Sequence, residues 1–271
     1  MKYIFILCCF VTTVMTAQTT QPTIKTMDKS VSQKTLAKQP ALTPKSKKAA
    51  MDANKKSKAA ASNPAFHAKD ANLPSNMVSP DDVERMAKYG LAVSEKNALG
   101  GLIEGSKAPN FKAKDQNGNT IELKELLKEG KVVVVFYRGY WCGICNRALA
   151  EFETELKSIT DKGAKVIAIT TESNESAKNT IEKNDITFSV ISDTDGKIAR
   201  DYRVLYEVSE EYQNKIINYT KSSIQKYNNS DAALLPVPAT YIIDQEGNIS
   251  WHQYSIDYSD RATVEEIVKE L

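Results

Sequence analysis

The chain has 271 residues, 41% of them hydrophobic and 26% charged, which is ordinary for a globular protein and leaves room for one large domain or two small ones. The net charge of +2 hides a division, because residues 18–79 carry eleven lysines and three aspartates while residues 80–271 carry 24 basic and 31 acidic residues. The overall charge therefore identifies no partner class, and we expect no nucleic-acid partner.

The first residues have the pattern of an export signal, which we assign to residues 1–17. Lys2 gives a short positive start, residues 3–15 are mostly apolar, and Thr16-Ala17 offers small side chains for cleavage. The apolar run is short for a bilayer span and is interrupted by threonines, although an uncleaved anchor remains an alternative. We expect an exported protein of the periplasm or cell envelope with no membrane span after cleavage.

Residues 18–79 are rich in Lys, Ala, Ser and Thr and poor in bulky apolar side chains. Such a segment cannot bury enough apolar surface to offset the entropy of ordering it. We predict a disordered Lys/Ala-rich linker. A polybasic segment for an anionic membrane or nucleic acid is the alternative, but the lysines are spread out and Phe66 is their only aromatic neighbour.

Residues 80–104 are predicted to form a helical lead-in to the domain. Ser79-Pro80 is a plausible helix start, and apolar residues follow at helical spacing. These are Val83, Met86, Ala87 and Leu91. Gly100-Gly101 is the expected end of the helix.

Residues 105–271 alternate between short apolar strands and amphipathic helices. In chain order we expect a strand after Phe111, a turn at 115–119, a strand at 120–123, a helix at 123–127, a strand from 132, a helix from 142 to near 161, a strand at 165–171, a helix at 173–184, a strand at 188–192, a helix at 197–203, a polar insertion at 204–235 with one or two helices, a hairpin at 241–254 and a helix at 261–271. The order predicts an α/β fold with a mixed central sheet and helices on both faces.

The stretch KVVVVFYRGYWCGICNR, residues 131–147, places Cys142 and Cys145 where a buried strand passes into a helix. Free backbone N–H groups and the helix dipole at that point favour thiolate over thiol. Signal cleavage would remove Cys8 and Cys9, so these two cysteines would be the only thiols of the mature protein. An exported protein with this pattern is predicted to use the pair for redox chemistry.

Half of a zinc site is the other interpretation of a C-x-x-C motif, and it requires a second cysteine pair or a histidine pair. The only histidines, His67 and His252, lie far apart in the sequence. We therefore predict no metal, and no cofactor beyond a redox-active disulfide.

These motifs resemble those of a known fold and a known family. The order of elements, the W-C-x-x-C motif and Pro238 directly before a strand resemble the thioredoxin fold. Four segments resemble the peroxiredoxin-like branch of the alkyl hydroperoxide reductase C / thiol-specific antioxidant family across residues 105–271. They are Ala108-Pro109-Asn110-Phe111, Phe136-Tyr137-Arg138-Gly139, residues 164–170 and Val237-Pro238-Ala239-Thr240.

The resemblance implies that Cys142 is the attacking thiolate and Cys145 the resolving thiol. With a hydroperoxide, Cys142 would become a sulfenic acid, and Cys145 would condense with it to a Cys142–Cys145 disulfide. With a protein disulfide, Cys142 would form a mixed disulfide that Cys145 resolves. A thioredoxin-like reductant would recycle the pair.

Four further residues are candidates by the same resemblance. Pro238 matches a cis-proline that faces the cysteines, or is a plain strand-entry proline. Arg138 would lower the pKa of the thiol and orient a peroxide, or is a surface arginine. Arg261 resembles a family arginine near the last helix, and Trp141 would shield the disulfide and pack against a partner.

The sequence also departs from the family. Gly139 and Val135 stand where peroxiredoxins carry Thr/Ser and Pro in the peroxide pocket, and Phe136 stands where thioredoxins carry a buried acid. We expect a peroxiredoxin-like antioxidant enzyme that reduces hydroperoxides. An envelope protein disulfide reductase and a non-catalytic binding module with this fold remain as alternatives.

Overall fold

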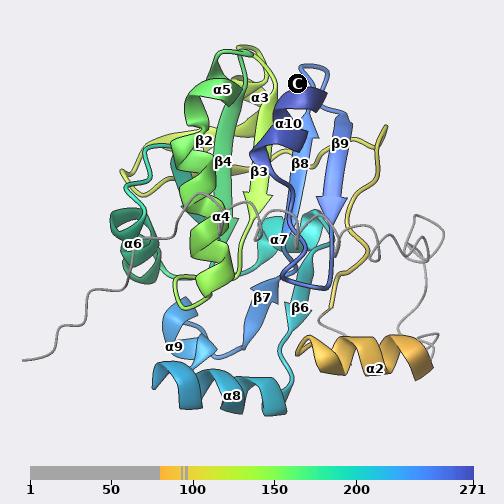
Figure 1. Ribbon diagram of the computed structural model, residues 1–271, viewed down its shortest axis with the longest axis vertical. Coiled ribbons are helices and arrows are strands. Elements are labelled where there is room, and N and C mark those ends of the chain that lie inside the picture. The colour runs from red at the N-terminus through yellow and green to blue at the C-terminus, as the bar shows by residue number, and fades with distance from the viewer. Residues whose placement is uncertain (1–79, 93, 95–96) are drawn as a thin grey trace, which may run out of the picture. The chain divides into compact units, whose positions relative to one another are not determined.

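The computed structural model describes residues 80–92, 94 and 97–271 (Figure 1). The predicted signal at 1–17 and the predicted linker at 18–79 lie outside these residues. The helices are α2 (Pro80–Lys88), α3 (Leu123–Leu126), α4 (Gly143–Thr154), α5 (Leu156–Thr160), α6 (Asn174–Lys183), α7 (Lys197–Asp201), α8 (Glu210–Thr220), α9 (Ile224–Asn228) and α10 (Val264–Glu270). The strands are β1 (Lys112–Lys114), β2 (Thr120–Glu122), β3 (Val132–Phe136), β4 (Lys165–Thr170), β5 (Ser189–Ser192), β6 (Leu205–Glu207), β7 (Leu234–Pro236), β8 (Ala239–Ile243) and β9 (Ile249–Tyr254).

Five strands form the central sheet in the order β5-β4-β3-β8-β9. The strands β3, β4 and β5 are parallel, whereas β8 pairs antiparallel with β3 and β9 pairs antiparallel with β8. Figure 1 shows α4 and α10 crossing one face of this sheet. The predicted α/β class with a mixed sheet is confirmed.

The central strand β3 is buried on both faces, as its unbroken run of β-branched residues requires. Alternate side chains enter two separate cores because side chains along a strand point to opposite faces. Val133 and Val135 pack with residues of α4, α5 and α10, and Val132, Val134 and Phe136 pack with residues of α3, α7 and the insertion. Each such side chain stabilises the fold by about 1.5–3 kcal/mol when fully buried.

The lead-in helix is shorter than predicted. It ends at Lys88, and Gly90 follows in the left-handed region with φ of 84°. The Leu91 N–H donates to the Met86 carbonyl at 2.9 Å and the Gly90 N–H donates to the Ala87 carbonyl at 3.1 Å, which is a Schellman motif. Met86 and Leu91 are buried, as predicted. Ala87 was predicted to face the core, but it is exposed.

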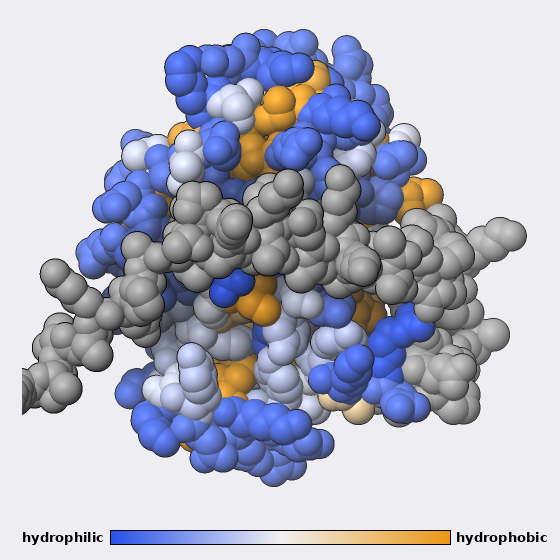
Figure 2. Space-filling model, in the orientation of Figure 1, coloured by the Kyte–Doolittle hydropathy of each residue, from blue (hydrophilic) through white to orange (hydrophobic). Residues whose placement is uncertain are grey.

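One or two helices were predicted in the insertion at 204–235, and it contains two, α8 and α9, together with a strand pair that the sequence did not indicate. Strands β6 and β7 pair antiparallel, with Tyr206 opposite Leu235. Leu91 and Ala98 form isolated bridges with Val208 and Leu205, so the lead-in adds to the same small sheet. Figure 2 shows hydrophilic side chains over the outer side of α8.

Two predicted helix boundaries are corrected. The helix expected from 142 to near 161 is two helices, α4 and α5, separated at Glu155. The last helix begins at Val264 rather than Arg261, because Thr263 and Glu266 form a reciprocal capping box at its start.

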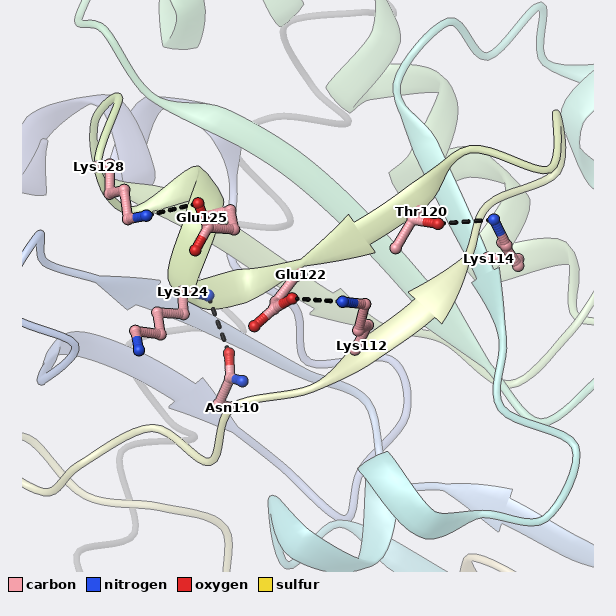
Figure 3. Close-up of polar contacts among 8 residues, drawn as sticks. All are labelled: Asn110, Lys112, Lys114, Thr120, Glu122, Lys124, Glu125 and Lys128. Carbon is pink, nitrogen blue, oxygen red and sulfur yellow. Dashed lines mark hydrogen bonds and ion pairs between the residues drawn. The ribbon is translucent and has the colours of Figure 1, made fainter.

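The hairpin of β1 and β2 covers part of the sheet edge at β5. Asp115 accepts hydrogen bonds from the Asn117 and Asn119 N–H groups in the turn, and it bridges to Ile191 of β5. Figure 3 shows the ion pair between Lys112 and Glu122 across the hairpin, which contributes little to stability because solvent reaches both side chains. The hairpin thus limits how much of the β5 edge is open for pairing.

In the part of the chain that the structure describes, no helix has both the length and the apolar character needed to cross a bilayer.

Candidate active site

The two cysteines lie where the loop after the central strand leads into a helix. The strand β3 ends at Phe136, and α4 begins at Gly143 with Cys142 as its N-cap residue. The Cys142 sulfur accepts a hydrogen bond from the Cys145 N–H at 3.3 Å, and the Cys142 N–H donates to the Gly139 carbonyl at 3.0 Å. The buried strand and the capped helix therefore fix the first sulfur at a helix N-terminus, as the sequence predicted.

Cys142 and Cys145 form a disulfide, with their Cα atoms 5.3 Å apart. Cys142 is 6% exposed and Cys145 is completely buried. A reagent from solvent therefore meets Cys142 first, which agrees with the role predicted for it. The attacking and resolving roles themselves remain predictions.

Arg138 is almost completely buried, so the interpretation as a surface arginine is wrong. Its Nη2 donates to the Tyr212 hydroxyl at 2.9 Å. Its guanidinium also lies over the rings of Tyr258, Trp141 and Tyr212 at 4.2, 4.8 and 5.3 Å from their centroids. Aromatic faces attract a desolvated cation, so these three rings stabilise the buried charge beside the cysteine loop.

Arg261 contacts the second cysteine rather than the first. Its Nη2 lies 3.2 Å from the Cys145 sulfur, and its Nε donates to the Tyr258 carbonyl at 2.8 Å. Burial and the nearby charge of Arg138 lower the pKa of Arg261 to about 10, so it stays charged at neutral pH. The arrangement places a cation where a Cys145 thiolate would form.

Trp141 precedes the disulfide and is partly buried against both cores. Its indole nitrogen is buried and has no hydrogen-bond partner among the described residues. The ring covers the Arg138 guanidinium, so its observed contact is with the arginine. A shielding or partner-packing role stays a prediction.

Pro238 lies at the same edge of the sheet as the cysteine loop, because its neighbour Ala239 pairs with Phe136. The described residues contain no cis peptide bond, so the expected cis-proline is corrected to trans. The trans form of an X–Pro bond is lower in energy by about 0.5–1 kcal/mol, and the Val237 N–H is bound to the Val204 carbonyl at 2.7 Å.

Glu172 is a member of this site that the sequence analysis missed. It follows β4, which runs parallel to β3, so both strands end at the same edge of the sheet. The carboxylate is fully buried and accepts from the Tyr140 N–H at 3.0 and 2.9 Å. Burial raises the pKa of Glu172 to about 8, although the Tyr140 amide opposes the shift. An acidic residue directly after a buried strand was the available signal.

Glu172 also explains why Gly139 stands where the family pattern has Thr or Ser. A Cβ on Gly139 would lie 2.5 Å from Glu172 Oε1 and 2.8 Å from Trp141 Nε1. Gly139 has φ of +149°, a conformation that other residues rarely adopt. The carboxyl and the indole therefore occupy the space of a side chain at this position.

These groups together suit two-electron sulfur chemistry. Attack on the Cys142 sulfur would release Cys145 as a thiolate beside the Arg261 guanidinium, and a better-stabilised thiolate leaves faster. Among the described residues, no group of three or more His, Cys, Asp or Glu side chains is placed to hold a metal ion.

Residues 105–252 match the AhpC/TSA family. The thiol-disulfide oxidoreductase ResA of Bacillus subtilis is 33% identical over 149 residues, covering 55% of this chain and 65% of that protein. The chloroplastic peroxiredoxin Q of Triticum aestivum is 29% identical over 140 residues, covering 52% and 61%. The chain thus matches less than two thirds of the length of either relative.

The solved structures that are similar include the peroxidoxin BcpB from Mycobacterium tuberculosis. It has 19% sequence identity and a TM-score of 0.48, and the match covers 62% of this chain and 94% of that one.

Proposed function

Because the chain belongs to the AhpC/TSA family, we propose that it is a thiol-dependent oxidoreductase whose Cys142–Cys145 pair cycles between dithiol and disulfide. The observation that supports this most is the disulfide itself, formed at a helix N-terminus with only Cys142 within reach of solvent. The Arg261 guanidinium, whose Nη2 lies 3.2 Å from the Cys145 sulfur, also supports the proposal.

The proposed oxidant is a hydroperoxide. The Cys142 thiolate attacks the terminal peroxide oxygen, the O–O bond breaks, and an alcohol or water leaves with one proton from solvent. Cys142 is then a sulfenic acid, and the Cys145 thiol condenses with it to give the disulfide and water. A hydroperoxide is small enough to reach a sulfur on a residue that is only 6% exposed.

A protein disulfide is the second candidate substrate, and the match to ResA favours it. Here the Cys142 thiolate attacks a substrate sulfur and forms a mixed disulfide. Cys145 then attacks Cys142, which releases the substrate as a dithiol and leaves the Cys142–Cys145 disulfide.

In either cycle a dithiol reductant of the thioredoxin type returns the pair to the reduced state. We place this chemistry outside the cytoplasm, in the periplasm or cell envelope. The export pattern of residues 1–17 supports that location, and a removed signal would leave the pair as the only thiols.

The experiment gives reduced full-length protein, with Cys8 and Cys9 replaced by serine, a hydroperoxide in one assay and oxidised insulin in another. Disulfide formation with peroxide supports the peroxidase. Insulin reduction without peroxide consumption supports the disulfide reductase. If the reduced protein shows neither reaction, the redox proposal is lost and a binding module is the remaining function.

A further inference from the structure

Glu172 has a fully buried carboxyl group beside the cysteine loop. Its hydrogen bonds are those from the Tyr140 N–H to its two oxygens. Among the described residues no Lys, Arg or His forms an ion pair with it. A buried carboxylate without a counter-ion is costly, so the group is not explained by stability alone.

The Tyr140 peptide connects this carboxyl group to the cysteines. On one side the Tyr140 N–H donates to Glu172, and on the other the Tyr140 carbonyl accepts from the Asn146 side chain at 2.5 Å. The same Asn146 amide also donates to the Cys142 carbonyl at 3.0 Å. One peptide therefore joins Glu172, through hydrogen bonds, to the loop that holds the first sulfur.

Other titratable groups lie on the loop and helices near this carboxyl group. Tyr137 of the same loop is buried, and the charge of Glu172 adds to burial in raising its pKa. Lys183 of α6 lies 5.5 Å from the centroid of the Tyr140 ring. Cys145 lies on α4, Cys142 is the N-cap residue of that helix, and Arg138 is on the loop itself. With its pKa near 8, Glu172 holds a proton at neutral pH.

We propose that Glu172 is a positioning residue whose protonation is coupled to the redox state of the Cys142–Cys145 pair. This inference rests on the proposed function. A thiolate of a dithiol reductant attacks Cys142, the S–S bond breaks, and its electron pair leaves on Cys145. The second reductant sulfur then displaces Cys142, so two electrons and up to two protons reach the pair. While one sulfur remains a thiolate, its charge opposes ionisation of Glu172, which keeps its proton to a higher pH.

The test is an infrared titration of the carboxylic-acid carbonyl stretch between pH 6 and 10. It uses the full-length chain with Cys8 and Cys9 replaced by serine, fully oxidised or reduced with dithiothreitol. In the oxidised protein the band should disappear as the pH passes about 8. In the reduced protein it should persist to a pH higher by on the order of one unit, the effect of a nearby like charge.

Two variants assign the band. Glu172→Gln keeps an oxygen that accepts from the Tyr140 N–H but should lack the band, whereas Glu151→Gln, at an exposed site on α4, should retain it. Asp193 is also buried, but its pKa of about 6 means that its carbonyl band should disappear at a lower pH than the band of Glu172.

The coupling is refuted if the band titrates at the same pH in both redox states, a comparison that needs no variant. It is also refuted if Glu172→Gln folds and retains the band. A pair that cannot be reversibly oxidised and reduced instead defeats the proposed function. A pair that cycles with an unmoved band defeats only this inference.

Discussion

Arg261→Met tests whether the contact on the second sulfur controls the redox equilibrium. Methionine keeps much of the side-chain volume but removes the charge that lies 3.2 Å from Cys145. In the disulfide that sulfur is neutral, so the contact is weak. In the reduced state it can be a thiolate, and a hydrogen bond to a charged group contributes about 1.5–3 kcal/mol.

The loss therefore falls mainly on the reduced protein. Reduction should become less favourable by roughly ten- to 150-fold, since each 1.36 kcal/mol is a factor of ten. For a two-electron couple this corresponds to a reduction potential about 30–60 mV more negative. The assay equilibrates the protein with dithiol buffers of graded potential and measures free thiols by alkylation and mass spectrometry.

Two controls accompany that titration. Arg147→Met removes the same charge from an exposed position on α4 and should leave the equilibrium within about threefold of the parent. Arg261→Lys keeps a cation and should recover part of the loss. If Arg261→Met and Arg147→Met give the same equilibrium, the guanidinium does not stabilise a Cys145 thiolate.

Gly139→Ala should destabilise the fold by about 2–4 kcal/mol in urea unfolding, from backbone strain and the clash with Glu172, and a loss below 1 kcal/mol would contradict the geometry. Folding raises the pKa of Glu172 from 4.5 to about 8, so the folded state binds more protons than the unfolded state, and the free energy of unfolding should fall by roughly 3–5 kcal/mol between pH 4.5 and 8. Glu172→Gln should lack this fall. Parallel curves of unfolding free energy against pH for the parent and the variant would refute the prediction. Tyr212→Phe removes the hydrogen bond to Arg138 and should cost about 1.5–3 kcal/mol of unfolding free energy, whereas an unchanged midpoint would show that the rings alone hold the cation.

The cysteine position was predictable because it depends on local pattern. A β-branched run, a short loop and a helical period determine it without long-range information, and Cys142 is found at the predicted helix start. Helix ends were less predictable where two glycine signals compete. Gly90 ends α2 because its left-handed conformation lets the Leu91 and Gly90 N–H groups donate to the Met86 and Ala87 carbonyls, while Gly100 and Gly101 lie in the following loop.

The surroundings of the sulfurs could not be predicted in the same way, because they come from distant segments. Arg138 is buried by rings from positions 212 and 258, which no local spacing relates to it. Glu172 reaches the cysteine loop only through the parallel register of β3 and β4. Arg261 was a candidate by resemblance, but its contact with the Cys145 sulfur rather than with Cys142 depends on how the last loop packs.

We propose that Cys142 reacts first and that Cys145 resolves the product. The most direct measurement exposes the reduced protein to one equivalent of hydroperoxide in the presence of dimedone and locates the products by peptide mass spectrometry. We expect a Cys142–Cys145 disulfide in the parent protein, a dimedone adduct on Cys142 in Cys145→Ser, and no peroxide consumption by Cys142→Ser. An adduct on Cys145 in Cys142→Ser, with peroxide consumed at the parental rate, would contradict it.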